Sequence, residues 1–354
     1  MTEGEPAKLK RAINEEVTLK DIAEVVGKSV AAVSRALNDY DDISEETRAD
    51  VKRVAQEMGY MPNLMARRLK KRATDTLGLI LPVFSPRDSD PFFSELLSGI
   101  ASEATRYGYD LLVSTCTPGP TEKQTYRRLI SSRRVDGILV ARPRWKDDRI
   151  DLLLEKQFPF VAIGPAQLPE EVPTVAEDAG AGARLIVEHL IGQGYKQIAL
   201  INAPLELVFS SDYLTGFRGA IVKAGLPVND DFLEQSEFTQ GDGYRVGQLL
   251  LSKPTAPTAI VTADDVVALG VMAAAQDQGL EVGNDLAVTG YGDILLSEHS
   301  QPPLTTIHRP TYTMGQHACR QLIARLRGET LENNHVVFKP SLVIRQSSDL
   351  TLWL

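Results

Sequence analysis

The spacing of hydrophobic residues changes partway along this chain, and the change predicts two kinds of structure. In the first 75 residues, apolar positions recur every three or four residues, as in short amphipathic helices. Beyond them, short apolar runs alternate with longer amphipathic segments. Alternating strand and helix predicts parallel sheets that are covered on both faces. The chain is therefore expected to join an all-α N-terminal part to an α/β part.

The α/β part contains two successive series of strand-like and helix-like segments. The expected strands cover 77–82, 111–114, 135–141, 197–202, 259–262 and 286–290, and the expected helices cover 92–107, 121–133, 212–225 and 264–279. Two series predict two lobes, each with its own doubly wound sheet. A small molecule would then bind between the lobes, at the carboxyl ends of the strands.

The N-terminal part contains two short helices that are joined by a tight turn. Thr18 is a good N-cap with Asp21 as its capping-box partner, and Gly27 suits the left-handed end of the first helix. Ser29 can cap the second helix. Its outward positions are Val30, Ala31, Ser34 and Arg35. This is the layout of a DNA-reading helix-turn-helix, although an ordinary helical hairpin gives the same spacing.

A third amphipathic helix is expected over 45–58, and a basic segment follows it. Five of the six residues from Arg67 to Arg72 are basic, and Leu69 is the aliphatic residue among them. Such a segment has too little apolar surface to fold alone. It suits a DNA minor groove, where basic side chains meet phosphates and an apolar wedge parts a base step. A solvated linker is the alternative.

These features together resemble the headpiece and hinge of the lactose repressor (LacI/GalR) family of bacterial transcription regulators. The similarity lies in Val17-Thr-Leu-x-Asp-Ile-Ala, Gly27-x-Ser29, Val33-Ser-Arg-x-Leu-Asn38, Ile43-Ser-x-x-Thr-Arg48, Gly59-Tyr-x-Pro-Asn63 and Ala66-Arg-x-Leu69. The resemblance implies base contacts by Val30, Ala31 and Arg35. It implies mainly phosphate contacts by Thr18, Ser29, Ser34 and Asn38. In the hinge, it implies that Leu69 intercalates at the operator centre, with Asn63, Ala66 and Arg67 beside it.

The chemistry of the second helix suggests how it would read DNA. Val30 and Ala31 are small and apolar, which favours contact with thymine methyl groups. Arg35 is expected to bind a guanine edge with two hydrogen bonds, and a phosphate contact is the alternative for it.

The resemblance continues through the α/β part. It lies in Pro91-Phe-Phe-Ser-Glu-Leu96, Val135-Asp-Gly-Ile-Leu139, His189-Leu-Ile-x-x-Gly-Tyr195, Ala263-Asp-Asp-x-x-Ala-Leu-Gly270 and Pro303-Leu-Thr-Thr-Ile307. It implies a periplasmic-binding-protein-like fold in which Phe93 and Phe238 line the ligand pocket and Asp264 holds ligand hydroxyls. Arg142 falls in a loop that often reaches this pocket. Core packing is the alternative for each aromatic ring.

Two positions depart from the family pattern. Tyr213 stands where the family usually has an arginine, and Gly292 stands where it usually has an aspartate. Those two side chains commonly grip a sugar or a purine, so an ordinary monosaccharide is not the expected effector. A larger glycoside or an acidic metabolite is the hypothesis instead, with Arg142, Arg144 and Trp145 as new contacts.

The net charge of −9 lies outside the DNA-binding part. Residues 1–75 hold 14 basic and 14 acidic residues, so the whole excess is carried by the remainder. Affinity for phosphate depends on the local surface, and the contact is therefore confined to one end. The first 16 residues have no signal-peptide pattern, and no run reaches the roughly 20 apolar residues of a membrane span. A cytoplasmic, nucleoid-associated location without membrane contact is expected.

The expected organisation is a disordered extension over 1–16, a headpiece over 17–60, a hinge over 61–75 and a two-lobed effector and dimerisation domain over 76–354. The expected function is a ligand-released repressor that binds a palindromic operator as a homodimer. Because no leucine heptads trail the last strand, a dimer is favoured over a tetramer. A regulator with a co-repressor and a small-molecule-binding protein without gene control are the alternatives. No catalytic motif, metal spacing or cofactor is expected, and Cys116 and Cys319 are taken as reduced thiols.

Overall fold

The computed structural model describes residues 17–60, 73–82, 90–119, 121–164, 168–330 and 333–353. The chain divides into two compact units, residues 1–73 and 74–354. The predicted extension and the basic segment of the hinge lie outside the described residues. With them lie Asn63, Ala66, Arg67 and Leu69.

Residues 17–60, the described part of the first unit apart from its last residue, form three helices around a small core. They are α1 (Leu19–Val26), α2 (Val30–Leu37) and α3 (Glu45–Glu57). Each buries one apolar stripe, and all three pack on one another. Ile22, Val33 and Val51 are fully buried at the centre. Because three short stripes meet, helices that would be marginal alone are stable together.

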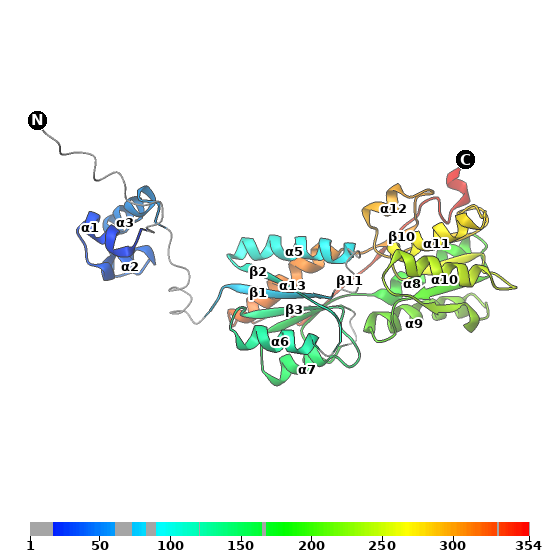
Figure 1. The fold of residues 1–354 in the computed structure, drawn as a ribbon, viewed down its shortest axis with the longest axis horizontal. Helices are drawn as coiled ribbons and strands as arrows, with labels where there is room; N and C mark the ends of the chain where they lie inside the picture. The colour runs from blue at the N-terminus through cyan, green and yellow to red at the C-terminus, as the bar shows by residue number, and fades with distance from the viewer. Residues whose placement is uncertain are drawn as a thin grey trace, which may run out of the picture. The chain divides into compact units, whose positions relative to one another are not determined.

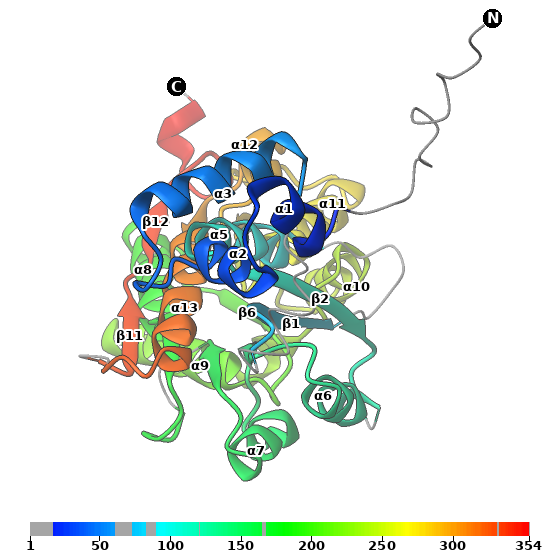
Figure 2. The ribbon, with the colours of Figure 1, turned by 90° about the vertical axis from the view of Figure 1, so that its left-hand side faces the viewer.

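The first lobe of the second unit is built on a six-stranded parallel sheet, in the order β11-β5-β4-β3-β1-β2. Its strands are β1 (Thr76–Pro82), β2 (Asp110–Cys116), β3 (Gly137–Ala141), β4 (Phe160–Ile163), β5 (Thr174–Glu177) and β11 (His335–Phe338). Its helices are α5 (Pro91–Tyr107), α6 (Glu122–Ser131), α7 (Asp148–Glu155) and α13 (Thr311–Leu326). Figure 1 and Figure 2 show α5 on one face of the sheet and α6 with α7 on the other. Strands such as β3 and β4 are buried throughout, as expected for a sheet covered on both faces.

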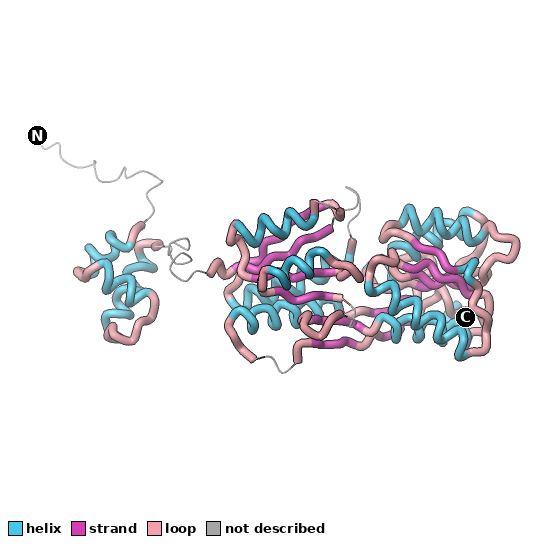
Figure 3. Tube along the Cα trace, turned by 90° about the horizontal axis from the view of Figure 1, so that it is seen from below, coloured by secondary structure: helices cyan, strands magenta, loops and turns pink. Residues whose placement is uncertain are grey.

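The second lobe is built on a four-stranded parallel sheet, in the order β7-β6-β8-β9. Its strands are β6 (Ile198–Asn202), β7 (Leu233–Gln235), β8 (Ala259–Thr262) and β9 (Ala287–Thr289), with the antiparallel pair β10 (Thr306–His308) and β12 (Ser341–Val343) beside α8. Its helices are α8 (Ala179–Gly192), α9 (Val208–Lys223), α10 (Gln240–Leu251), α11 (Asp265–Asp277) and α12 (Leu295–His299). Short 3-10 turns cover Asp230–Phe232 and Leu350–Trp353. Helices and strands alternate in layers in both lobes (Figure 3).

The chain crosses between the lobes three times, because α13 and β11 return to the first lobe. The crossings follow β5, β10 and β11. The crossings contact one another. Arg309, after β10, pairs with Glu177 at the end of β5, and the Asp178 N–H, after β5, donates to the carbonyl of Phe338 at the end of β11. The predicted two-lobed α/β architecture is confirmed. Among the described residues, no helix has the length and apolar character to cross a membrane.

Candidate functional site

The turn between α1 and α2 is fixed by local hydrogen bonds. Thr18 and Asp21 form a capping box, in which the Thr18 N–H donates to the Asp21 carboxylate over 2.8 Å. Gly27 ends α1 with φ of 66°, a conformation that is open to glycine at little cost. Ser29 then caps α2, and its Oγ accepts from the Ala32 N–H over 3.1 Å. The two helices are therefore held at a defined angle by the chain that joins them.

The outward face of α2 is a solvent-exposed surface of small side chains and one arginine. Val30 is 45% exposed, and Ala31 and Arg35 are exposed beside it. Ser34 is half-buried, and its carbonyl accepts a hydrogen bond from the Asn38 side chain over 2.6 Å. With Val33 and Ala36 buried on the other side, this face is free to enter a groove of DNA.

Arg35 is held in place by its neighbours. Its guanidinium lies 2.8 Å from the Asp42 carboxylate and 5.5 Å from the centre of the Tyr40 ring. Both members of the ion pair are about half exposed, so the pair is weak and a base or a phosphate can replace Asp42.

Positive charge is scarce in the described part of the headpiece. Residues 17–60 contain six basic and nine acidic residues. On α3, Arg48 pairs with Glu45, and Arg53 pairs with Asp50 and Glu57. The charge that would attract phosphate is therefore concentrated in the sequence from Arg67 to Arg72.

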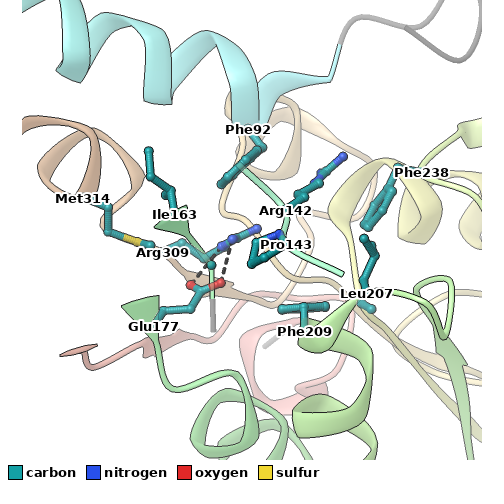
Figure 4. Close-up of a pocket in the computed structure, with 12 residues that line it drawn as sticks. Phe92, Arg142, Pro143, Ile163, Glu177, Leu207, Phe209, Phe238, Arg309 and Met314 are labelled. Atoms are coloured by element: carbon teal, nitrogen blue, oxygen red, sulfur yellow. Dashed lines mark hydrogen bonds and ion pairs between the residues drawn. The ribbon is translucent and has the colours of Figure 1, made fainter. Parts of the chain in front are cut away.

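A pocket lies between the two lobes. It contains about 460 Å³ of space between atoms, including open solvent at its mouth. It is lined by Phe92, Arg142, Pro143, Ile163, Gly164, Glu177, Leu207, Phe209, Phe238, Ala263, Arg309 and Met314 (Figure 4). Apolar walls with a few polar groups are typical of small-molecule sites.

Arg142 occupies the centre of this pocket. Its guanidinium lies 3.9 Å from the centre of the Phe238 ring and 5.0 Å from that of Phe92, and Figure 4 shows it between them. The Asp90 carboxylate is 2.5 Å away but is not oriented as a hydrogen-bond acceptor. Within the described part of the chain, both terminal nitrogens of Arg142 are buried without a hydrogen bond. An oxygen-rich ligand would supply the missing acceptors.

A second buried pair forms one wall of the pocket. Arg309 makes two contacts with the Glu177 carboxylate, of 2.6 and 2.9 Å. Its guanidinium also lies 4.6 Å from the centre of the Phe92 ring. Glu177 ends β5 and Arg309 follows β10, so this pair joins two of the three crossings.

Asp264 lies at the start of α11, directly after Ala263, and is not itself among the residues that line the pocket. It caps the helix by accepting from the Val266 N–H over 2.8 Å. Burial, and then the charge of Asp90, raise the pKa of Asp264 to about 7, while Arg142 opposes the shift. The carboxyl is therefore partly protonated near neutral pH and can both donate to and accept from a ligand hydroxyl.

Replacing Asp264 with asparagine is expected to raise the thermal unfolding midpoint at pH 8 by several degrees and to change it little near pH 4. The folded protein holds this proton more tightly than the unfolded chain, so the buried charge destabilises the fold increasingly from about pH 4 to 7, by up to about 4 kcal/mol. Asparagine keeps the cap and removes the charge. Thermal unfolding of both proteins at several pH values measures the difference.

Asp178→Asn is the matched control, since Asp178 caps α8 with a half-exposed side chain. A pH-independent difference for Asp264→Asn, or the same profile in the control, would contradict the assigned buried charge.

Comparison with known proteins identifies the family. "Bacterial regulatory proteins, lacI family" matches residues 18–63, and "Periplasmic binding protein-like domain" matches residues 187–348. The HTH-type transcriptional repressor CytR of Escherichia coli (strain K12) is 34% identical over 332 residues, which cover 94% of this chain and 96% of that protein. The chain belongs to the lacI family. The resemblance found in the sequence is confirmed, and the chain is a ligand-responsive transcriptional regulator.

Other members of the lacI family match along nearly the whole chain. The HTH-type transcriptional regulator AglR of Rhizobium meliloti (strain 1021) is 34% identical over 340 residues, with 94% of each protein covered. The lac repressor dimer bound to operator and the anti-inducer ONPF has a TM-score of 0.82 at 28% identity, covering 95% of this chain and 100% of that one. The CelR–cellobiose complex has a TM-score of 0.74 at 30% identity, with 94% and 100% covered.

The two positions that depart from the family pattern, Tyr213 and Gly292, are not among the residues that line the pocket. Tyr213 is fully buried and donates to the Thr262 carbonyl over 2.9 Å, while its ring stacks against Phe209. Gly292 has φ of 146°, which a side chain rarely adopts. Asp293, one residue later, pairs with Arg345 over 2.7 Å. Tyr213 thus places an aromatic ring, packed against Phe209, where the resemblance implied a charged side chain.

The structure brings only some of the remaining predicted ligand residues to the pocket. Arg142 and Phe238 are among the residues that line it. Phe93 packs in the core of the first lobe, edge-on to Phe92, and its ring centre lies 5.0 Å from the Arg142 guanidinium, but of the two rings only Phe92 lines the pocket. Arg144 pairs with Glu122, and the Trp145 side chain is half exposed.

Sequence reasoning missed Phe209, Glu177 and Arg309. Glu177 is the last residue of a buried strand, whereas Asp264, which the sequence did single out, lies just beyond one. Phe209 and Arg309 lie at a helix start and in a crossing, and no motif marks them.

Proposed function

We propose that this protein represses transcription by binding a palindromic operator as a homodimer, and that a small molecule bound between the lobes releases the DNA. The exposed outward face of α2, on helices positioned for groove entry, is the observation that carries the DNA-binding half of the proposal. A two-fold dimer would present two such helices to successive major grooves.

On DNA, Val30, Ala31 and Arg35 would meet base edges, and Thr18, Ser29, Ser34 and Asn38 would meet phosphates. Asn63, Ala66, Arg67 and Leu69 would bind the minor groove at the operator centre. The solved lac repressor dimer is described as bound to operator, which supports the same arrangement here.

The effector would be an uncharged ring compound such as a glycoside. Phe238 would stack on one face of the ring, and Asp264 and Arg142 would bind its hydroxyls. The two arginines in the pocket already face carboxylates, Asp90 for Arg142 and Glu177 for Arg309. An acidic ligand would have to displace one of these carboxylates, so the sequence hypothesis of an acidic metabolite is less well supported than a glycoside. The CelR relative is described with cellobiose.

The proposed site binds and does not catalyse, and it requires no cofactor or metal. A cytoplasmic, nucleoid-associated location follows from operator binding. The proposal is tested against two alternatives. In the first, the ligand is a co-repressor; in the second, the protein binds a small molecule without controlling genes.

DNA binding is tested by selecting sites from random duplexes with the full-length protein and measuring the affinity of the selected DNA at two salt concentrations. The expected result is a palindrome whose dissociation constant rises steeply with salt, because basic residues release counterions from DNA. If no site were enriched, or affinity did not depend on salt, a binding protein without gene control would replace the proposal.

The effector class is tested by thermal shift with cellobiose, maltose and sucrose against glucuronate and glucose 6-phosphate. A bound ligand raises the unfolding midpoint by mass action. The uncharged sugars are expected to give the shift, and Phe238→Ala to reduce it, with Phe232→Ala, a buried ring away from the pocket, as control. A shift by the acidic compounds alone would restore the acidic-metabolite hypothesis.

A further inference from the structure

A loop of the first lobe is bonded to the second lobe beside the pocket. The loop joins β3 to α7, and the opposing loop joins β6 to α9. The Val208 N–H donates to the Pro143 carbonyl over 3.2 Å, and the Trp145 N–H donates to the Glu206 carbonyl over 3.1 Å. Arg144 and Leu207 face each other between these bonds as an antiparallel bridge. We call residues 143–145 with 206–208 the inter-lobe clasp.

A buried charge network holds the first-lobe half of the clasp. Arg149 is 2% exposed, and its side chain binds Asp147 with contacts of 2.6 and 2.8 Å and Glu122 at 3.4 Å. Asp147 also accepts from the Arg144 N–H over 3.0 Å, and Glu122 pairs with the Arg144 side chain over 2.7 Å. The network therefore binds the loop through both the backbone N–H and the side chain of Arg144.

Arg149 also supports the turn that directs Arg142 into the pocket. Arg142 has φ of 51°, an uncommon conformation for a residue with a side chain. The carbonyl of Arg142 accepts from Arg149 over 2.9 Å, and that of Ala141 accepts over 3.3 Å. On the other side, Pro143 packs where any side chain at Gly164 would overlap it. These contacts fix both the strained turn and the start of the clasp.

Stability alone does not account for this network. A buried ion cluster seldom stabilises a fold more than apolar residues of similar size. One of its backbone contacts, from the Arg149 N–H to Asp147, caps α7. The others, to the carbonyls of Ala141 and Arg142 and from the Arg144 N–H, go to the segment that bears Arg142 and the clasp. The Arg142 side chain also joins the two lobes, because its guanidinium stacks on Phe238, which belongs to the second lobe.

We propose that Arg149 is a positioning residue that holds the inter-lobe clasp closed, and that opening and closing of the clasp links pocket occupancy to DNA affinity. The second half of this inference rests on the proposed function. With the clasp closed, the lobes enclose the pocket. A ligand that favours this arrangement shifts the population of the whole unit by its differential affinity.

Val208→Pro opens the clasp with little disturbance elsewhere. Val208 is the first residue of α9, where proline is well tolerated, and Leu207 before it has φ of −78° and ψ of 135°, which suits a residue before proline. The substitution removes the N–H that crosses to Pro143 and exchanges the buried valine side chain for a proline ring. Val208→Ala keeps this N–H while trimming the buried side chain, and is the matched control.

Hydrogen exchange of the full-length protein without ligand tests the clasp. Val208→Pro is expected to speed exchange of the Trp145 amide, in the other lobe, by about tenfold, while Val208→Ala and the amides of β1 and β8 stay near wild type. Arg149→Lys keeps the charge but loses the paired hydrogen bonds. It is expected to speed exchange of residues 205–208, which lie in the second lobe, opposite Arg149. If neither variant changed exchange in the lobe opposite the substituted residue, the proposal of a clasp would be overturned.

The regulatory half is tested by the affinity of Val208→Pro for a selected palindrome without ligand. It is expected to bind DNA about threefold more tightly than wild type, because the closed arrangement is the one that releases DNA. Faster exchange with unchanged DNA affinity would overturn the regulatory link and leave a structural joint. If wild-type protein bound no DNA, the proposed function would fail, while the exchange result would still stand.

Discussion

Replacing Arg35 with alanine is expected to weaken binding to the selected palindrome by about 10- to 100-fold, since one bidentate base contact contributes about 1–3 kcal/mol of discrimination. Arg35 is the arginine on the outward face of α2, and its weak pair with Asp42 leaves it available to a base edge. Fluorescence anisotropy of labelled duplexes at fixed salt measures the change. Repeating the site selection with the variant should show relaxed preference at one position of each half-site.

Arg53→Ala is the control for a general loss of positive charge. Arg53 lies on α3, is similarly exposed and is paired with Asp50 and Glu57. It is expected to change operator affinity little. If Arg35→Ala lowered affinity equally for all sequences and reduced the salt dependence, Arg35 would be a phosphate contact, which is the alternative that the sequence left open.

Replacing Arg309 with methionine is expected to destabilise the two-lobed unit by about 3–5 kcal/mol, because it leaves the Glu177 carboxylate buried without its partner. Glu177 is 2% exposed and Arg309 is 12% exposed. Urea unfolding of the full-length protein, followed by circular dichroism, measures the loss. The effector is expected to bind more weakly as well, because the pair forms part of the pocket wall.

Two further variants separate a buried pair from a general effect of removing arginine. Glu177→Gln combined with Arg309→Met is expected to recover much of the lost stability, since no unpaired charge remains. Arg245→Met breaks an exposed pair with Asp242 and is expected to cost less than about 1 kcal/mol. A double variant no more stable than Arg309→Met would refute the electrostatic explanation.

Much of the architecture could be predicted because it is encoded locally. Thr18, Gly27 and Ser29 mark helix ends through their own backbone preferences, and the structure shows these caps. The apolar runs behind β1, β3, β6 and β8 are long enough to be recognised as buried strands. Three-residue strands such as β10 and β12 carry no comparable pattern, because pairing partners distant in sequence define them.

The pocket could be predicted only in part for the same reason. Arg142 directly follows a buried strand, and the resemblance placed Phe238. Glu177 and Arg309 come into contact because the chain crosses between the lobes three times. No local sequence pattern predicts this contact. Tyr213 was recognised as a departure, but its role beneath Phe209 depends on packing that spacing does not reveal.

The most direct test of the account is an anisotropy titration of the full-length protein on the selected palindrome, with and without cellobiose or whichever other sugar of the panel gives the largest thermal shift. The account predicts that the sugar raises the dissociation constant for DNA in the wild type and has a much smaller effect in Phe238→Ala. An unchanged dissociation constant at a sugar concentration that saturates the thermal shift would contradict it, because the pocket would then be filled without consequence for DNA binding.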